Sequence, residues 1–222
     1  MSLPNVTTFN IGTGNITYIV NAAAATSSPL ALATTIMPNF PLQQRVIASS
    51  VGNDSGIFFR IVGLNQAGFT VTEFLAGTNA TFAQSNLDYS KIISIQGSSS
   101  STVLIPAATA NSVSVGVSTT GGQGSTMWNI MNWHVSPVNI ELSGVTVGTQ
   151  GVTWTAQYTY DDPNNLPAGI FFPQPFNHPT LINQTGSLDG PINDPVTAVR
   201  LLIAAGTGTV RFTVIQAGIG SP

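Results

Sequence analysis

Apolar and polar side chains alternate with a period of two along much of this chain, which is the pattern of β-strands rather than of helices. The clearest example lies near the end, where two apolar runs flank the glycine-containing tetrapeptide 205–208. The apolar residues of these runs that share one face are Val199, Leu201 and Ile203, then Val210, Phe212 and Val214. Glycine supplies the positive φ that a tight turn demands. We therefore predict a β-hairpin with one buried face across residues 197–218.

A similar arrangement occurs earlier, where the segments Lys91–Gly97 and Asn111–Val117 bracket a connection rich in Ser, Ala and Thr. In both places a charged residue enters an apolar strand, a connection of small residues follows, and an alternating valine strand comes next. We interpret this as two related β-units in tandem.

The first unit, residues 45–120, contains further strand patterns at Arg45–Ser50, Ile57–Val62 and Phe69–Leu75. The Asn-Asp-Ser-Gly sequence between the first two is a strong turn signal. It could also suggest a calcium loop, but it lacks the spaced acidic ligands and the closing glutamate of such loops. A plain turn is therefore favoured.

The second unit, residues 126–222, follows the polar, glycine-rich segment 118–125, which is the best candidate for a domain boundary. Its most regular strand has an apolar stripe on one face, formed by Val152, Trp154, Ala156, Tyr158 and Tyr160. We expect Trp154 to lie in the core. The sequence Asp-Asp-Pro after Tyr160 ends this strand and opens a long loop, 161–195, and loops of such length are usually functional or partner-bound.

Residues 1–44 are low in charge and rich in Ala, Thr, Ser, Asn and Pro, with one plausible strand at Ile16–Val20. We expect part of this segment to be an extended arm that lies on a neighbouring subunit. The fold class expected is all-β, with two tandem β-sandwich or jelly-roll-like units and an extended N-terminal arm.

Composition narrows the function. Charged residues make up only 6% of the 222 residues, against roughly 25% in ordinary soluble proteins. Much of the surface is therefore expected to be covered by other subunits. The five Lys and Arg residues are scattered along the sequence and form no basic stripe, and the net charge is −3. Both observations argue against direct nucleic-acid binding. The absence of cysteine excludes disulfides, thiol catalysis and zinc–cysteine sites.

No secretory signal is evident, because the first residues lack a basic region followed by an apolar core. We therefore expect synthesis in a cytoplasm. The segment 197–218 is long and apolar enough to raise the question of a membrane span, but Arg200, Arg211 and three glycines argue against one.

Catalytic and metal chemistry has few candidates. Neither His134 nor His178 accompanies a Gly-x-Ser-x-Gly elbow, and His178 is expected to hydrogen-bond loop backbone. Asp161 and Asp162 are adjacent, so a strand would point them to opposite faces, and the proline after them favours a turn. A calcium site of His178 with two loop aspartates, Asp189 and Asp194, is conceivable but not favoured. We expect no enzyme activity, cofactor or metal.

Aromatic residues are the best candidates for a binding surface. The long loop holds Phe171, Phe172 and Phe176, which are costly to leave in water. Trp128 and Trp133 lie beside the predicted boundary, where they could fill an interface or serve in an ordinary core. We expect these five residues to contact another subunit. The alternative for the phenylalanine loop is that it folds back onto its own unit.

Two parts of the sequence resemble proteins of tailed-bacteriophage virions. In residues 50–73, Gly-Asn-Asp-Ser-Gly precedes a strand and is followed by Gly-x-Asn-x-x-Gly and a strand with Thr-Glu. The second half of the chain resembles another pattern found in phage proteins, and four segments carry this resemblance: 154–163, 177–178, 184–190 and 195–218. The resemblance implies a virion component and includes no catalytic residue.

The interpretation favoured on these grounds is a capsid decoration or cement protein that stabilises the phage head by bridging capsomers. Its partners would be the major capsid protein, further copies of itself, or both, in the virion, with no nucleic acid and no membrane. The alternative is a head- or tail-fibre protein that binds a host surface glycan through Trp128, Trp133 or Trp154. A tail-associated hydrolase is a third possibility, which the poverty of His, Lys and carboxylates argues against.

Overall fold

The computed structural model of the chain describes these residues: 4–11, 15, 17–35, 43–65, 67–117, 124–132, 134, 139–147, 151–167 and 173–216. They form strands, turns and loops without a helix, and the strands pair antiparallel, which confirms the prediction of an all-β protein. Within the same residues, no helix has the length and apolar character to cross a membrane.

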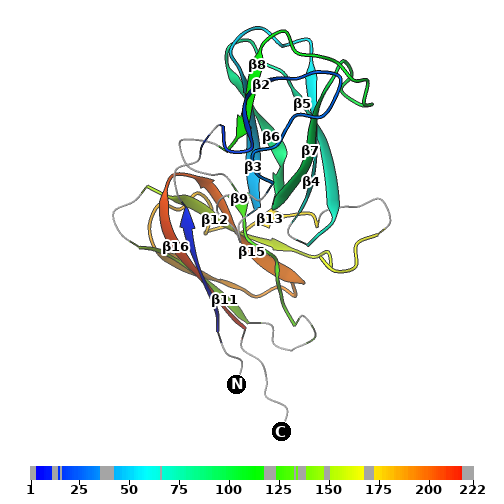
Figure 1. Cartoon of the computed structure of the whole chain (residues 1–222). Coiled ribbons are helices and arrows are strands. Elements are labelled where there is room, and N and C mark those ends of the chain that lie inside the picture. Colours follow the sequence, from blue (N-terminus) through cyan, green and yellow to red (C-terminus); the bar gives the residue numbers. More distant parts are fainter. Residues whose placement is uncertain are drawn as a thin grey trace. The chain divides into compact units, whose positions relative to one another are not determined.

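The chain forms two compact units (Figure 1). Unit 1 consists of Met1–Gly12 and Ser125–Pro222, and unit 2 of Thr13–Gly124. The strand β1 (Asn5–Ile11) belongs to unit 1 because it pairs along its whole length with β16 (Gly208–Gln216). The segment 1–44 thus contains β1 and, in unit 2, β2 (Val20–Ala24) in place of the strand predicted at 16–20.

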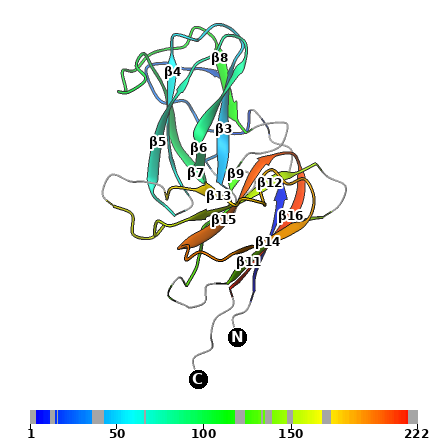
Figure 2. The ribbon, with the colours of Figure 1, turned by 180° about the vertical axis from the view of Figure 1, so that it is seen from behind.

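Unit 1 has two groups of paired strands, and Figure 2 shows the first group from behind. Its order is β1-β16-β11-β14, where the last two are Ile140–Val147 and Leu188–Ile192. The second group has the order β13-β12-β15, and these strands are Phe176–Asn177, Thr153–Thr159 and Ala198–Ala205. A short strand, β10 (Asn129–Ile130), also pairs with β15.

The predicted hairpin across residues 197–218 is wrong. β15 pairs with β12, whereas β16 pairs with β1 and β11, so the two strands belong to different groups. The turn chemistry is as expected, with φ of +88° at Gly206 and 139° at Gly208. All six apolar residues of the predicted faces are buried: Val199, Leu201, Ile203, Val210, Phe212 and Val214. Alternation shows which face is buried and leaves the pairing partner open.

Trp154 is the largest fully buried side chain of the described residues, which confirms its predicted place in the core. Its indole N–H donates a hydrogen bond to the carbonyl of Gly186 at 3.1 Å. Gly144 of β11 lies against the ring, because a Cβ there would come within 2.4 Å of the indole carbons. The two strand groups of unit 1 therefore meet at a tryptophan packed on a glycine.

Unit 2 also has two groups of paired strands. One has the order β6-β3-β8-β2, in which the first three strands are Phe82–Tyr89, Gln43–Ser50 and Ser112–Gly116. The other has the order β5-β4-β7, with strands Thr70–Ala76, Phe58–Leu64 and Lys91–Ser98. Both groups contribute to one core, for example Val46, Val113 and Val115 from the first, and Phe59, Ile61 and Ile92 from the second. The short β9 (Gly124–Ser125) lies where unit 2 ends and unit 1 begins.

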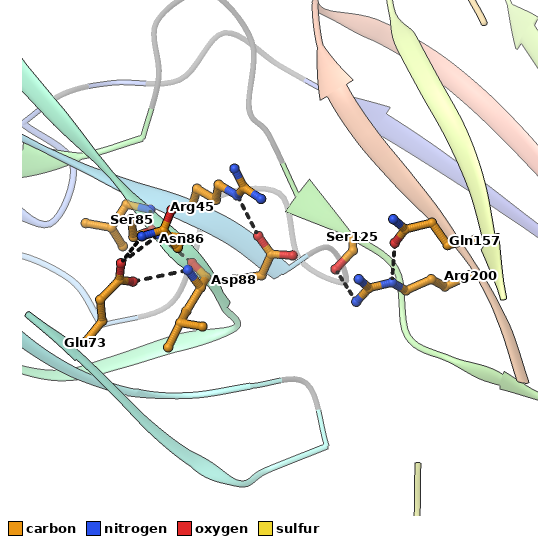
Figure 3. A network of polar contacts seen from close by, with 10 residues as sticks. Arg45, Glu73, Ser85, Asn86, Asp88, Ser125, Gln157 and Arg200 are labelled. Carbon is orange, nitrogen blue, oxygen red and sulfur yellow. Dashed lines mark hydrogen bonds and ion pairs between the residues drawn. The ribbon is translucent and has the colours of Figure 1, made fainter. Parts of the chain in front are cut away.

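At a bulge in β6, side chains take the place of backbone partners for several N–H groups (Figure 3). Ser85 Oγ accepts the Val46 N–H at 2.9 Å and donates to the Leu87 carbonyl at 2.9 Å. The N–H groups of Asn86 and Leu87 donate to the two carboxylate oxygens of Glu73 at 2.8 and 3.1 Å. Glu73 lies on β5, so it joins an edge of one strand group to an edge of the other.

The neighbourhood of this bulge holds the other charged groups of β3 and β6. Arg45 and Asp88 form an ion pair with an N–O distance of 3.4 Å. Tyr89 is fully buried, and this burial, together with the carboxylate of Glu73, raises the pKa of its hydroxyl well above the ordinary value. Tyr89 therefore stays neutral at physiological pH.

We expect Trp154→Ala to lower the free energy of unfolding by about 3–5 kcal/mol, because a cavity would replace the indole in the core. Urea denaturation followed by circular dichroism measures this loss. Phe82→Ala is the control: Phe82 is 65% exposed, so its truncation should cost at most about 0.5 kcal/mol. Equal losses in the two variants would contradict the assignment of Trp154 to the core.

We expect Glu73→Gln to destabilise unit 2 by about 1–3 kcal/mol, because an amide NH₂ would replace one of two acceptor oxygens that face N–H donors. Hydrogen exchange of the Asn86 and Leu87 amides provides a local measurement, in which their protection should fall. Glu141→Gln makes the same charge change on β11 in unit 1 and should leave those two amides unaffected. Unchanged protection in the Glu73 variant would refute the proposed role of Glu73.

Candidate functional site

Two of the five aromatic residues predicted to line an interface, Trp128 and Phe176, lie within the described part of the chain. Phe171, Phe172 and Trp133 lie outside the described residues. Phe176 is the first residue of β13, and Trp128 lies just before β10. The site is therefore built from these two residues and the side chains that contact them.

Phe176 forms a cluster with two tyrosines, Tyr158 and Tyr160, which we call the aromatic cluster. Phe176 and Tyr158 are opposite each other in the β12–β13 ladder and stack with ring centroids 5.8 Å apart and an interplanar angle of 21°. Tyr160 packs edge-on against both rings, each at a centroid distance of 5.6 Å. Tyr160 is 48% exposed and Phe176 42% exposed, so the three rings support one another while presenting apolar surface to solvent.

The position of the cluster follows from where β12 ends. The apolar stripe of this strand is buried at Trp154 and Ala156 but becomes exposed at Tyr160. The strand stops at Thr159, and the Asp161-Asp162-Pro163 turn follows at once. The last tyrosines of the stripe therefore lie beyond the buried core.

The two aspartates of this turn serve the backbone, as predicted. Asp161 accepts the N–H of Gln174 at 2.7 Å, which ties the start of the long loop to the segment that leads into β13. Asp162 accepts the N–H of Asn164 at 2.9 Å, the contact of a turn-forming side chain. Thr197 donates its hydroxyl to the Asp161 carbonyl at 2.5 Å, which fixes the turn to the entry of β15.

His178 holds the segment that follows the aromatic cluster, and its predicted bonding to loop backbone is confirmed. It is 2% exposed. Its Nδ1 accepts the N–H groups of Thr180 and Leu181 at 3.3 and 3.2 Å. Because these donors need an acceptor, the ring proton is on Nε2, which donates to the Pro191 carbonyl at 3.1 Å. The ring thus joins the loop to β14.

Trp128 belongs to a separate polar network centred on Arg200 of β15. Figure 3 shows the contacts of Arg200 with Ser125 and Gln157. The Arg200 guanidinium lies 4.5 Å from the centroid of the Trp128 ring, a cation–π arrangement. Its Nε donates to Gln157 Oε1 at 2.8 Å and its Nη1 to Ser125 Oγ at 3.2 Å. Gln157 in turn donates to Asn177 Oδ1 at 2.8 Å, so the network reaches β13.

The two described site residues do not form one patch. Gln157 and Asn177 are paired across β12 and β13, and Tyr158 and Phe176 are the next pair along. Neighbouring residues of a strand point to opposite faces. The Trp128–Arg200 network and the aromatic cluster therefore lie on opposite faces of the same strands.

The polar groups of the aromatic cluster are tyrosine hydroxyls. The pKa of Tyr160 is raised by partial desolvation, and next by Tyr158 and the Asp194 carboxylate, so its hydroxyl is neutral at physiological pH and can donate a hydrogen bond. Among the described residues, no three His, Asp or Glu side chains group closely enough to hold a metal ion. His178, Asp189 and Asp194 therefore do not form the calcium site considered from the sequence.

Comparison with known proteins adds no relative: no family model, curated protein or solved structure matches the chain.

Sequence reasoning missed three participants, namely Tyr158, Tyr160 and Arg200. A signal for the tyrosines was present, because Asp-Asp-Pro directly after Tyr160 marks the end of the strand and hence the limit of its buried stripe. Arg200 carried no such signal. Its partners Trp128, Gln157 and Ser125 are far from it in sequence, and only strand pairing brings them together.

We expect His178→Ala to lower the free energy of unfolding by at least about 2 kcal/mol, because two N–H groups of the loop and the Pro191 carbonyl of β14 lose their partner. Thermal unfolding followed by circular dichroism measures the loss. His134→Ala is the matched control, since His134 is exposed and its truncation should change stability by about 0.5 kcal/mol or less. Equal effects of the two substitutions would refute the structural role of His178.

Proposed function

We propose that this chain is a structural protein of a tailed-bacteriophage virion, and specifically a decoration or cement protein that stabilises the head by bridging capsomers. The observation that carries the proposal is the exposed aromatic cluster of Tyr158, Tyr160 and Phe176 on a chain with only 6% charged residues. The resemblance of the sequence to virion proteins supports the same proposal.

The energetics of the aromatic cluster suit a protein interface. Tyr160 and Phe176 are each close to half exposed, so covering the rest of each is worth roughly half of the about 1.5–3 kcal/mol that full burial of a large apolar side chain provides. The cores of interfaces are enriched in aromatic residues and depleted of charge. The three rings already contact one another, so little side-chain entropy remains to be lost on binding.

The finer architecture we propose is two tandem β-sandwich units, of jelly-roll-like character. Support comes from the way the two strand groups of each unit share one core, through Trp154 against Gly144 in unit 1 and through a common apolar cluster in unit 2. Such rigid units suit a protein that spans neighbouring subunits of a shell. A modest contact repeated over the lattice gains strength through multivalency.

The aromatic cluster favours protein burial over the alternative, glycan binding by a head or tail fibre. Trp154 is buried and Trp128 has Arg200 over its ring, so these two predicted sugar-binding rings are engaged within the chain. Within the aromatic cluster, Tyr158 and Phe176 stack on each other. Tyr160 beside Asp194 is the feature that would support a sugar contact.

The test is the double substitution Tyr160→Ser with Phe176→Ser, introduced into the phage that encodes the chain. We expect the purified variant to stay folded, because each of the two side chains is close to half exposed and lies outside the buried core. Its copy number in purified particles should fall by about tenfold or more, and the particles should release their DNA at a lower temperature. The control is Phe69→Ser with Phe82→Ser, two exposed phenylalanines of unit 2, which should be incorporated normally.

The outcomes separate the proposals. A wild-type chain that is absent from purified particles would overturn the virion assignment. Normal incorporation of the Tyr160/Phe176 variant would exclude the aromatic cluster as the contact. Binding of the purified chain to host surface polysaccharide that is lost with Tyr160→Ser would favour the fibre protein.

A further inference from the structure

The edges of the strand groups differ in how they are protected. An edge strand presents a row of backbone N–H and C=O groups that another strand can pair with. Natural proteins block such edges with covering segments, bulges, charges, prolines or short strands. The described part of the chain uses nearly all of these devices.

In unit 2 the edges are covered or interrupted. The outer edge of β7 is covered by residues 30–35, which lie much earlier in the chain. The Leu30 N–H donates to the Ile95 carbonyl at 2.8 Å, and the Ile92 N–H donates to the Thr35 carbonyl at 2.7 Å. The edges of β5 and β6 are joined through Glu73. The short β2 has a register shift and a left-handed residue.

In unit 1 the second group and one edge of the first are protected as well. β13 is two residues long, and the rest of the β12 edge is paired with the loop, through Trp154 N–H to the Gln184 carbonyl at 2.9 Å and Ala156 N–H to the Leu181 carbonyl at 2.8 Å. β14 carries Pro191 and the exposed Asp189.

The remaining edge, β1, has none of these features. Its seven residues, Asn-Val-Thr-Thr-Phe-Asn-Ile, include no charge, proline or glycine. Its ladder with β16 runs over all seven pairs without a register shift, so the strand is regular. Phe9 is 4% exposed and anchors β1 in the core of unit 1, whereas Val6 is 51% exposed on the other face. Among the described strands, β16 is the partner of β1, and it lies on one side.

We propose that β1 is a self-association edge, at which two copies of the chain pair their β1 strands antiparallel about a twofold axis. The first sheet of unit 1 then continues from one copy into the other. A twofold interface uses the same surface on both copies, so β1 has to pair only with another β1. Main-chain hydrogen bonds supply the contact, as in other cases of strand addition.

The side chains of β1 fit this twofold pairing. With the axis at Thr8, Thr8 lies opposite Thr8 of the second copy and Val6 lies opposite its Asn10, and Thr–Thr cross-strand pairs are favourable. The nearest charge, Arg211, is opposite Thr8 on β16. The two Arg211 side chains are then three strand spacings apart, about 14 Å, which exceeds the screening length of about 8 Å at physiological ionic strength. No like charges oppose the contact.

The proposal concerns β1 and is independent of the aromatic cluster and of the virion assignment. The test uses the full chain in sedimentation equilibrium and light scattering. We expect the wild type to be a dimer whose dissociation constant rises about tenfold or more in the double variant Val6→Lys with Thr8→Lys, because edge lysines block pairing and meet lysines of the other copy. Both positions are exposed, so the fold should persist.

The control is Thr102→Lys with Val103→Lys, which adds the same charge at exposed positions of unit 2 and should leave the dimer intact. A second measurement does not depend on the lysine variant folding. The chain has no cysteine, so Thr8→Cys places a single thiol at the expected axis. Oxidised glutathione, which accepts the two electrons, should convert it to a disulfide-linked dimer much faster than it does Thr102→Cys.

Three results would overturn the proposal. The first is a wild-type chain that stays monomeric up to its solubility limit, which would leave the edge to a different partner. The second is a dimer that survives the Val6/Thr8 lysine variant with its affinity unchanged. The third is disulfide formation at Thr8→Cys no faster than at Thr102→Cys.

Discussion

The structure depends on satisfying backbone hydrogen bonds wherever a strand ladder is interrupted. A buried N–H or C=O without a partner costs about as much as a lost hydrogen bond, and an all-β chain has many ladder ends. Here single side chains take over the missing bonds: Glu73 at the bulge of β6, His178 in the loop that leads to β14, and Asp161 at the turn after β12. With so few charged residues, several of those present are committed to the backbone.

Sequence periodicity predicted several of the long strands, because alternation is a local property of the chain, but it missed β1, β6 and β14. The last two strands show the limit. Every apolar residue assigned to their inner faces is buried, yet β15 and β16 pair with other strands. The pairing is decided by long-range contacts, here the fit of Trp154 on Gly144 and the addition of β1 to β16. The earlier pair, β7 and β8, likewise crosses between the two groups of unit 2.

The sequence predicted that the candidate site is aromatic, but it predicted only some of the residues that form it. A phenylalanine in a proline-rich loop indicated an exposed aromatic surface, and Phe176 is exposed. That it stacks on Tyr158 follows from the register of β13 on β12, which no local pattern specifies. Trp128 shows the converse: the guanidinium of Arg200 lies over its ring, and the sequence had offered Arg200 only as an argument against a membrane span. Phe171, Phe172 and Trp133 lie outside the described residues and stay predictions.

The small number of charged residues limits how the edge strands of this protein can be protected. A protein rich in lysine can guard each edge strand with charge, whereas this chain has five Lys and Arg residues in all. Covering segments, a bulge and a proline protect most of the other edges, and the carboxylates of Glu73 and Asp189 also lie there. No described segment passes along the free side of β1, and its sequence offers no substitute. It is this regular edge of seven residues that we propose is covered by a second copy of the chain.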